Sequence, residues 1–165
     1  MTPAYRRATV ADLPTIRALG QVVNRLHHEA WPHIFAAMPD RAGEDAHWLR
    51  SLQDDNGAAF LACVEDGAVG FVTLRLVDED HCLLQPGRHA LIGTLCVATA
   101  MRGRGIGRAL MAHAEEWAAT HGAGDIRLEV WEFNTAARRL YEELGYSIQA
   151  LTMNKPLSAA TGGSG

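Results

Sequence analysis

The sequence has no excess of basic residues and no long apolar run. Its formal net charge is −4, whereas proteins that bind nucleic acid through its phosphates carry a basic surface. No segment approaches the roughly 20 apolar residues that span a bilayer, and the first residues lack the apolar core of a signal peptide. These absences predict a cytoplasmic protein that binds neither nucleic acid nor a membrane.

Cysteine is also scarce. The three cysteines, Cys63, Cys82 and Cys96, are odd in number and contain no Cys-x-x-Cys pair. This pattern suits a reducing compartment better than a disulfide framework. The eight histidines include no His-Glu-x-x-His sequence and no pairing with cysteine at zinc-ligand spacing, so no metal site is expected.

The 165 residues are 48% hydrophobic, which is enough for one domain with a substantial core. We expect that domain over residues 1–157 and a flexible tail over residues 158–165, where the sequence is SAATGGSG.

Apolar periodicity predicts strands alternating with helices, interrupted by an early hairpin around Glu-Asp-Gly. The class is therefore α/β or α+β around a mixed sheet. The expected strands cover residues 5–10, 58–64, 68–76, 90–97 and 125–130. The expected helices cover residues 13–28 (capped by Asp12), a stretch around Trp48, 108–121 and 134–144, with a polar loop over 78–89 and extended chain over 146–155.

The stretch VATAMRGRGIGRALM (97–111) places three glycines and three arginines between an expected strand and an expected helix. Backbone N–H groups and the helix dipole converge at such a junction, and glycine lets an anion approach closely. It is not a P-loop, because Gly107 is followed by Arg108 and Ala109. It is not a dinucleotide fingerprint either, because Gly-x-Gly-x-x-Gly fails in both registers.

What fits is Arg102-x-x-Gly105-x-Gly107, which resembles the (Arg/Gln)-x-x-Gly-x-(Gly/Ala) loop of the GNAT superfamily of N-acetyltransferases. Further on, Asn134, Ala137 and Tyr141 repeat the family's Asn-x-x-Ala-x-x-x-Tyr spacing. The resemblance is clear over residues 90–157 and fainter before them. It implies a GNAT-like mixed, mostly antiparallel central sheet flanked by helices, with strands splayed at the acetyl-CoA site.

The resemblance implies transfer of an acetyl group from acetyl-CoA, as co-substrate, to a primary amine of a small molecule or of a peptide or protein N-terminus. The amine would attack directly in a ternary complex. Main-chain groups would hold the pantetheine arm and polarise the thioester, and Tyr141 would donate to the departing thiolate. The residues it assigns to acetyl-CoA are Leu95, Cys96, Val97, Arg102, Gly103, Arg104, Gly105, Ile106, Gly107, Arg108, Asn134 and Ala137.

The sequence does not single out one residue as the general base that would take the proton from the amine. Many relatives place a Glu on the strand before the loop, but that position here is Leu91. Glu129 resembles the carboxylate that serves as base in ribosomal-protein N-terminal acetyltransferases and is the first candidate, with a purely structural role as the alternative. His89, acting through water, is the second. An α-amine acceptor, with a pKa near 8, would lessen the need for a base.

The acceptor is also left open. In relatives the first two helices build its walls, which here implicates His27, His28, Glu29, Trp31 and Asp40. A rival function is a catalytically silent acetyl-CoA-binding module that acts as a sensor or interaction partner. The leucine at position 91 favours this rival and Tyr141 counts against it. The chain could also pair with a second copy of itself as a homodimer, and the sequence leaves its oligomeric state open.

Overall fold

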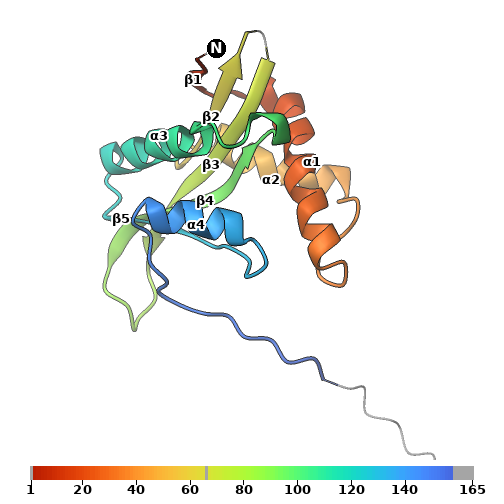
Figure 1. Ribbon diagram of the computed structural model, residues 1–165. Coiled ribbons are helices and arrows are strands. Elements are labelled where there is room, and N and C mark those ends of the chain that lie inside the picture. The colour runs from red at the N-terminus through yellow and green to blue at the C-terminus, as the bar shows by residue number, and fades with distance from the viewer. Residues whose placement is uncertain (1, 66, 158–165) are drawn as a thin grey trace, which may run out of the picture.

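The structure is a computed structural model, and it describes residues 2–65 and 67–157. Within those residues the chain forms five strands and four α-helices (Figure 1). The elements are β1 (Ala4–Arg7), α1 (Leu13–Ala30), α2 (Arg41–Gln53), β2 (Gly57–Val64), β3 (Gly67–Glu79), β4 (Gly87–Val97), α3 (Ile106–Thr120), β5 (Asp125–Leu128) and α4 (Thr135–Glu143), with short 3-10 helices η1 (Val10–Asp12) and η2 (Thr99–Met101). The tail predicted for residues 158–165 lies outside the described chain.

The strands form one sheet in the order β1-β2-β3-β4-β5. The first four strands pair antiparallel, and β5 pairs parallel to β4 after the crossover through α3. The predicted mixed, mostly antiparallel sheet flanked by helices is confirmed.

Helices cover both faces of the sheet (Figure 1). Successive residues of a strand point to opposite faces, so Phe71 packs with α1 and α2 while Val72 packs with α3 and α4. Both side chains are fully buried. The continuous apolar run of β3 therefore reflects a strand that is covered on both sides.

Several boundaries differ from those expected. Strands β3 and β4 extend into the predicted polar loop over 78–89 and leave residues 80–86 between them, and Asp78 and Arg88 pair across this hairpin in a two-bond ion pair of 2.7 and 2.9 Å. The strand expected over 125–130 ends at Leu128. The first strand ends at Arg7, and Val10 begins η1 instead. The extended chain expected over 146–155 joins no sheet, and residues 147–157 are exposed.

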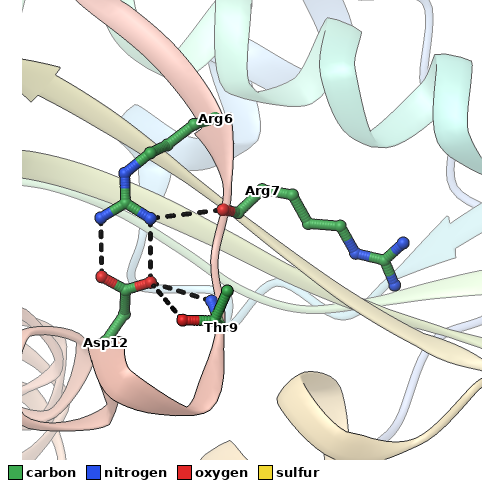
Figure 2. Close-up of polar contacts among 4 residues, drawn as sticks. All are labelled: Arg6, Arg7, Thr9 and Asp12. Carbon is green, nitrogen blue, oxygen red and sulfur yellow. Dashed lines mark hydrogen bonds and ion pairs between the residues drawn. The ribbon is translucent and has the colours of Figure 1, made fainter.

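The turn between β1 and α1 is held by one carboxylate (Figure 2). Asp12 lies at the N-cap position of α1, as predicted, but its side chain does not cap that helix. Instead, Arg6 donates to both Asp12 oxygens at 2.7 and 2.9 Å, and the Thr9 backbone N–H donates to Asp12 Oδ2 at 2.8 Å. Figure 2 shows the Arg7 side chain pointing away from this group, while the Arg7 backbone carbonyl accepts a hydrogen bond from Arg6 at 3.3 Å. The hydrogen bonds from Arg6 lower the pKa of Asp12 to about 2.

Asp12→Asn should lower the free energy of unfolding at pH 7 by about 1 kcal/mol. A fall in pKa from 3.8 to about 2 corresponds to about 2.4 kcal/mol, but Arg6 is 51% exposed and water screens the pair. Because the folded-state pKa lies below the unfolded one, this stabilisation is present above pH 4 and is lost as the pH falls toward 2. Urea titrations should therefore show the difference between wild type and variant shrinking over that interval.

The exposed Asp80 provides the control, since Asp80→Asn should change stability little at any pH. If Asp12→Asn costs the same at pH 7 and near pH 2, the charge of Asp12 is not what stabilises the turn.

Candidate acetyl-CoA and acceptor site

The glycine loop, residues 98–105, joins β4 to α3. Gly103 and Gly105 have φ of 73° and 77°, in the left-handed region that favours glycine, and the space beside both is open. The first backbone hydrogen bond of the helix runs from the Ala109 N–H to the Gly105 carbonyl at 3.0 Å. The N–H groups of Ile106, Gly107 and Arg108 come before it, so they have no acceptor within the helix. These donors suit a pyrophosphate.

The arginines of this loop are not equivalent. Arg108 pairs with Glu143 of α4 at 2.8 Å, and Arg102 donates to the Val97 carbonyl at 3.2 Å. Arg104 is exposed beside the loop. Arg102 and Arg104 are thus placed to meet an anion, while Arg108 also ties α3 to α4.

Gly107 lies where α3 meets α4. A Cβ there would lie 3.4 Å from Leu140 of α4 and 3.8 Å from Leu95 of β4, which are ordinary van der Waals distances. The packing of α4 against the start of α3 therefore does not require glycine at this position.

A bulge divides β4 in two. Thr73 of β3 is opposite Thr94 and Leu74 is opposite Ile92, so Gly93 is the extra residue. The pairing of β5 with β4 ends at Ile92 and Leu128, immediately before the bulge. Beyond that point β4 continues beside β3 alone, and its other edge faces the opening between β4 and β5. The predicted splaying of these strands is confirmed.

Thr73 supports the bulge. Its side chain is 2% exposed, and its hydroxyl oxygen accepts the Thr94 backbone N–H at 3.0 Å. A Cβ at Gly93 would lie 2.9 Å from that oxygen, too close for any other residue without displacing it. The sequence contained a signal for this arrangement, since an isolated glycine in a strand indicates a bulge or a close approach.

Within the second half of β4, Cys96 offers only its backbone. Its thiol points toward α1, where it donates to the Leu19 carbonyl at 3.3 Å. Burial raises the pKa of this thiol to about 11, so it stays protonated at neutral pH. This fits the prediction that residues 95–97 act through main-chain groups.

Helix α4 and its N-cap carry the other residues predicted to contact acetyl-CoA. Asn134 is its N-cap and accepts the Ala137 N–H at 3.2 Å through Oδ1, which leaves its side-chain amide N–H groups for a ligand. Tyr141 is buried, and burial raises the pKa of its hydroxyl to about 12, so the proton remains on it at neutral pH. Its ring lies 5.8 Å from that of Tyr146.

The candidate bases are widely separated. Glu129 is the first residue after β5, so it lies where β5 and β4 diverge, and its side chain is exposed. The strand ends one residue before it because the bulge turns β4 away. His89 lies on the first half of β4, five residues and about 17 Å along the strand from Thr94. That distance argues against His89 as the base.

A cavity of about 460 Å³, here the α1–α2 cavity, lies between α1, α2 and the segment that joins them, and it reaches Thr94 of β4. Of the predicted acceptor-wall residues, His27 and Asp40 line it, whereas His28 bonds the Phe35 carbonyl and Glu29 is exposed. The full lining is Val23, Asn24, His27, Phe35, Ala36, Pro39, Asp40, Gly43, Glu44, His47, Trp48 and Thr94.

The polar groups of this cavity are oriented by their neighbours. Glu44 accepts from Gln21 at 2.8 Å and from Asn24 at 3.3 Å. His27 Nδ1 lies 2.7 Å from the Val23 carbonyl, which places the Nδ1 proton in that bond and leaves Nε2 unprotonated in the neutral ring. Burial lowers the pKa of His47, so that ring is neutral at pH 7.

An aromatic cluster joins this region to the loop after β5. Trp31 meets Trp131 and Phe133 edge to face, with ring centres 5.6 and 5.2 Å apart, and Phe35 meets Trp131 at 4.8 Å. His27 contacts the same group, tilted against Phe35 with ring centres 4.8 Å apart and edge to face with Phe133 at 5.4 Å. The periodicity of the sequence did not indicate this cluster, because its members lie in loops about 100 residues apart.

Among the described residues, no three His, Cys, Asp or Glu side chains lie close enough to bind one metal ion. No helix in the described chain is both long and apolar enough to cross a membrane.

Residues 21–146 match the acetyltransferase (GNAT) family. The chain belongs to this family. As a GNAT member it is an N-acetyltransferase that uses acetyl-CoA as acyl donor, so the predicted family, reaction and co-substrate are confirmed.

Named relatives are of moderate identity. The acetyltransferase is 32% identical to aminoglycoside N(6')-acetyltransferase type 1 of Stenotrophomonas maltophilia, over 78% of this chain and 86% of that one. It is 31% identical to streptothricin acetyltransferase of Streptomyces lavendulae over 73% of this chain, but spans only 60% of that relative's length. With mycothiol acetyltransferase of Renibacterium salmoninarum the identity is 31%, over 87% of this chain and 44% of that one.

Solved structures share the fold. A mutant of the BH1408 protein from Bacillus halodurans has a TM-score of 0.83 at 25% identity, covering 94% of this chain and 99% of that one. The aminoglycoside acetyltransferase AAC(6')-Iy, in complex with a bisubstrate analogue of CoA, has a TM-score of 0.73 at 19% identity, covering 96% and 100%.

Gly105→Glu should abolish acetyl-CoA binding. The new side chain would force a non-glycine residue into φ 77° and bring a negative charge to the pyrophosphate donors. For wild type, acetyl-CoA at 100 times a micromolar Kd should raise Tm by about 5–10 °C. The variant should show no shift from its own ligand-free Tm, while Gln85→Glu, an exposed change far from the loop, should keep the full shift. A full shift in Gly105→Glu would mean that the loop does not bind the cofactor.

Proposed function

We propose that this acetyltransferase moves the acetyl group of acetyl-CoA to a primary amine of a small cationic molecule bound in the α1–α2 cavity, by direct attack in a ternary complex. Relatives named for aminoglycosides and for streptothricin support a small-molecule acceptor over a peptide N-terminus. The volume of about 460 Å³ falls within the usual range for small-molecule sites.

The charge of the cavity supports a cationic acceptor. Asp40 and Glu44 are among its lining residues, and no lysine or arginine is among the described residues that line it. Carboxylates without basic partners attract an ammonium group and raise its local concentration.

The observation that carries the proposal is the reach of this cavity to Thr94. Thr94 is the first residue after the bulge, at the point where β4 and β5 separate. An amine in the cavity would therefore lie beside the backbone that is proposed to hold the thioester.

The proposed acetyl-CoA site consists of main-chain groups, the amide of Asn134 and two arginines. The N–H groups of residues 106–108, with Arg102 and Arg104, would hold the pyrophosphate. Backbone groups of residues 95–97 and the amide of Asn134 would hold the pantetheine arm. Bound acetyl-CoA supplies an activated acetyl group as a thioester.

The acceptor must lose a proton. An alkylamine with a pKa near 10 is only about one part in a thousand unprotonated at pH 7, a cost of about 4 kcal/mol. Glu129, at the mouth of the opening, would take that proton directly or through water. Tyr141 would donate a hydrogen bond to the sulfur as it leaves, a role suited to a hydroxyl that stays protonated.

We also propose a cytoplasmic location. Cys63, Cys82 and Cys96 are all free thiols in the described chain, which suits a reducing compartment.

A panel of amines tests the function. Release of free CoA thiol should be fastest with compact polyamines or aminoglycosides and at least ten-fold slower, as kcat/KM, with a neutral peptide bearing a free N-terminus. The cause would be the carboxylate-lined cavity. If no amine releases thiol although acetyl-CoA raises Tm, the chain is a silent acetyl-CoA-binding module. If only peptides react, the proposed acceptor class is wrong.

Glu129→Gln should lower kcat/KM and remove the acidic limb of its pH profile, with acetyl-CoA affinity little changed, because protonation of the carboxylate would no longer limit the reaction. Tyr141→Phe is the companion variant: it should lower kcat ten-fold or more and leave the shape of the pH profile unchanged, since the hydroxyl acts only as the thiolate forms. An unaltered profile in Glu129→Gln would assign the proton to His27 Nε2 or to bulk water.

A further inference from the structure

Arginine supplies nearly all the positive charge of this chain. Of the 15 lysine and arginine residues, Lys155 is the only lysine and the other 14 are arginine. A guanidinium keeps its proton at any physiological pH, so an arginine side chain does not attack a thioester as a free amine. Lys155 is therefore the only side-chain amine that the enzyme offers to its own acetyl-CoA.

Residues 147–157, here called the C-terminal segment, carry this lysine. The segment leaves the end of the α4 region and runs away from the sheet (Figure 1). All its residues are exposed, and no hydrogen bond joins it to another residue of the described chain. Lys155 is also the only charged residue between positions 144 and 157. No contact within the described chain holds this amine away from the acceptor opening.

The start of the segment is fixed next to the proposed catalytic tyrosine. Tyr146 donates from its hydroxyl to Glu115 at 3.0 Å and from its backbone N–H to the Tyr141 carbonyl at 3.0 Å. The two tyrosine rings lie 5.8 Å apart. Lys155 follows nine residues after this anchor, and nine residues of flexible chain span about 16 Å on average and about 30 Å at most. The lysine can therefore reach the thioester that Tyr141 is proposed to contact.

We propose that the enzyme acetylates Lys155 of its own chain, with the C-terminal segment folding back so that the lysine amine enters the opening between β4 and β5. This inference rests on the proposed function, because it uses the same acetyl-CoA and the same opening. A tether of matching span gives an effective concentration on the order of millimolar, so at micromolar protein transfer within one chain is favoured about a thousand-fold over transfer between chains.

The charges around the opening suit this amine. Asp40 and Glu44 line the α1–α2 cavity, and Glu129 is exposed where β4 and β5 diverge. These carboxylates attract an ammonium group. A segment with one positive charge and no negative charge is therefore drawn toward the opening, and its apolar side chains bring no repulsion.

The step is an ordinary acetyl transfer. The ammonium of Lys155 loses one proton to Glu129 or to water, and its Nζ attacks the acetyl carbonyl carbon. A C–N bond forms as the C–S bond breaks, the nitrogen gives up a second proton, and the sulfur leaves as the CoA thiol. The products are N-acetyllysine, free CoA and one net proton, and the segment loses its only charge.

Mass spectrometry of the protein incubated with acetyl-CoA and no added acceptor tests the proposal. Wild type should gain the mass of one acetyl group, and peptide mapping should place that group on Lys155. Lys155→Arg keeps the charge and should gain nothing at this position, yet release CoA thiol with a free amine as fast as wild type. Tyr141→Phe should acetylate Lys155 at least ten-fold more slowly, a difference that spontaneous acetylation of an exposed lysine does not produce.

Mixing distinguishes transfer within one chain from transfer between chains. Lys155→Arg chains, whose acetyl-CoA site is intact, should not accelerate the modification of Tyr141→Phe chains in the same tube. The rate constant for wild type should stay the same when the protein concentration is raised ten-fold. A saturating small amine that is itself a substrate should slow the modification at least ten-fold, because both amines use one opening.

The outcomes separate this inference from the proposed function. If free amines are acetylated and Lys155 is not, self-acetylation is wrong and the proposed function stands. If neither is acetylated although acetyl-CoA raises Tm, both are wrong. Equal rates in wild type and Tyr141→Phe, or modification of Tyr141→Phe chains by Lys155→Arg chains, would also overturn the inference.

Discussion

The hydrogen bond from the Thr94 N–H to the buried Thr73 hydroxyl determines where the sheet stops being continuous. In a regular ladder that N–H would bond a backbone carbonyl of the neighbouring strand. Here the extra residue, Gly93, shifts the register, and a side chain supplies the acceptor. The shift keeps β4 joined to β3 but directs it away from β5. The Thr94–Thr73 hydrogen bond therefore keeps β4 attached to β3 at the point where the opening between β4 and β5 begins, and the reaction is proposed to take place in that opening.

This arrangement also explains why the proposed acetyl-CoA site and the proposed acceptor site meet at one point. The glycine loop follows the second half of β4, and the α1–α2 cavity reaches the first residue of that half. Each region is built by different elements from different parts of the chain. They come together because both border the second half of β4, which separates from β5.

The sequence was sufficient for the features that depend on local chemistry. The glycine loop, the strand before it and the helix after it were predicted within a few residues, since glycine, arginine and apolar periodicity act over short distances. A helix was expected to start at Asn134, and Asn134 is the N-cap of α4. The exposure of Glu129 was not foreseen, because the end of β5 depends on where its partner strand bends. The aromatic cluster likewise depends on which loops the fold brings together.

The difference between local chemistry and contacts between distant segments also explains the misplaced boundaries. The residues around Asp78 and Arg88 look like a polar loop when read singly, but across a hairpin they are a matched pair. Local composition cannot distinguish these two cases, because the deciding contact is between strands.

The contact between α3 and α4 has a consequence for how the enzyme can diversify. Arg108 of α3 pairs with Glu143 of α4, and this contact joins the helix that follows the glycine loop to the helix that carries Asn134 and Tyr141. The segment between α1 and α2 is attached to the loop after β5 mainly through aromatic side chains that meet edge to face. Substitutions in that segment would reshape the α1–α2 cavity for a different amine while leaving the proposed acetyl-CoA site unchanged. A fold divided in this way can change its acceptor while the chemistry of acetyl transfer stays the same.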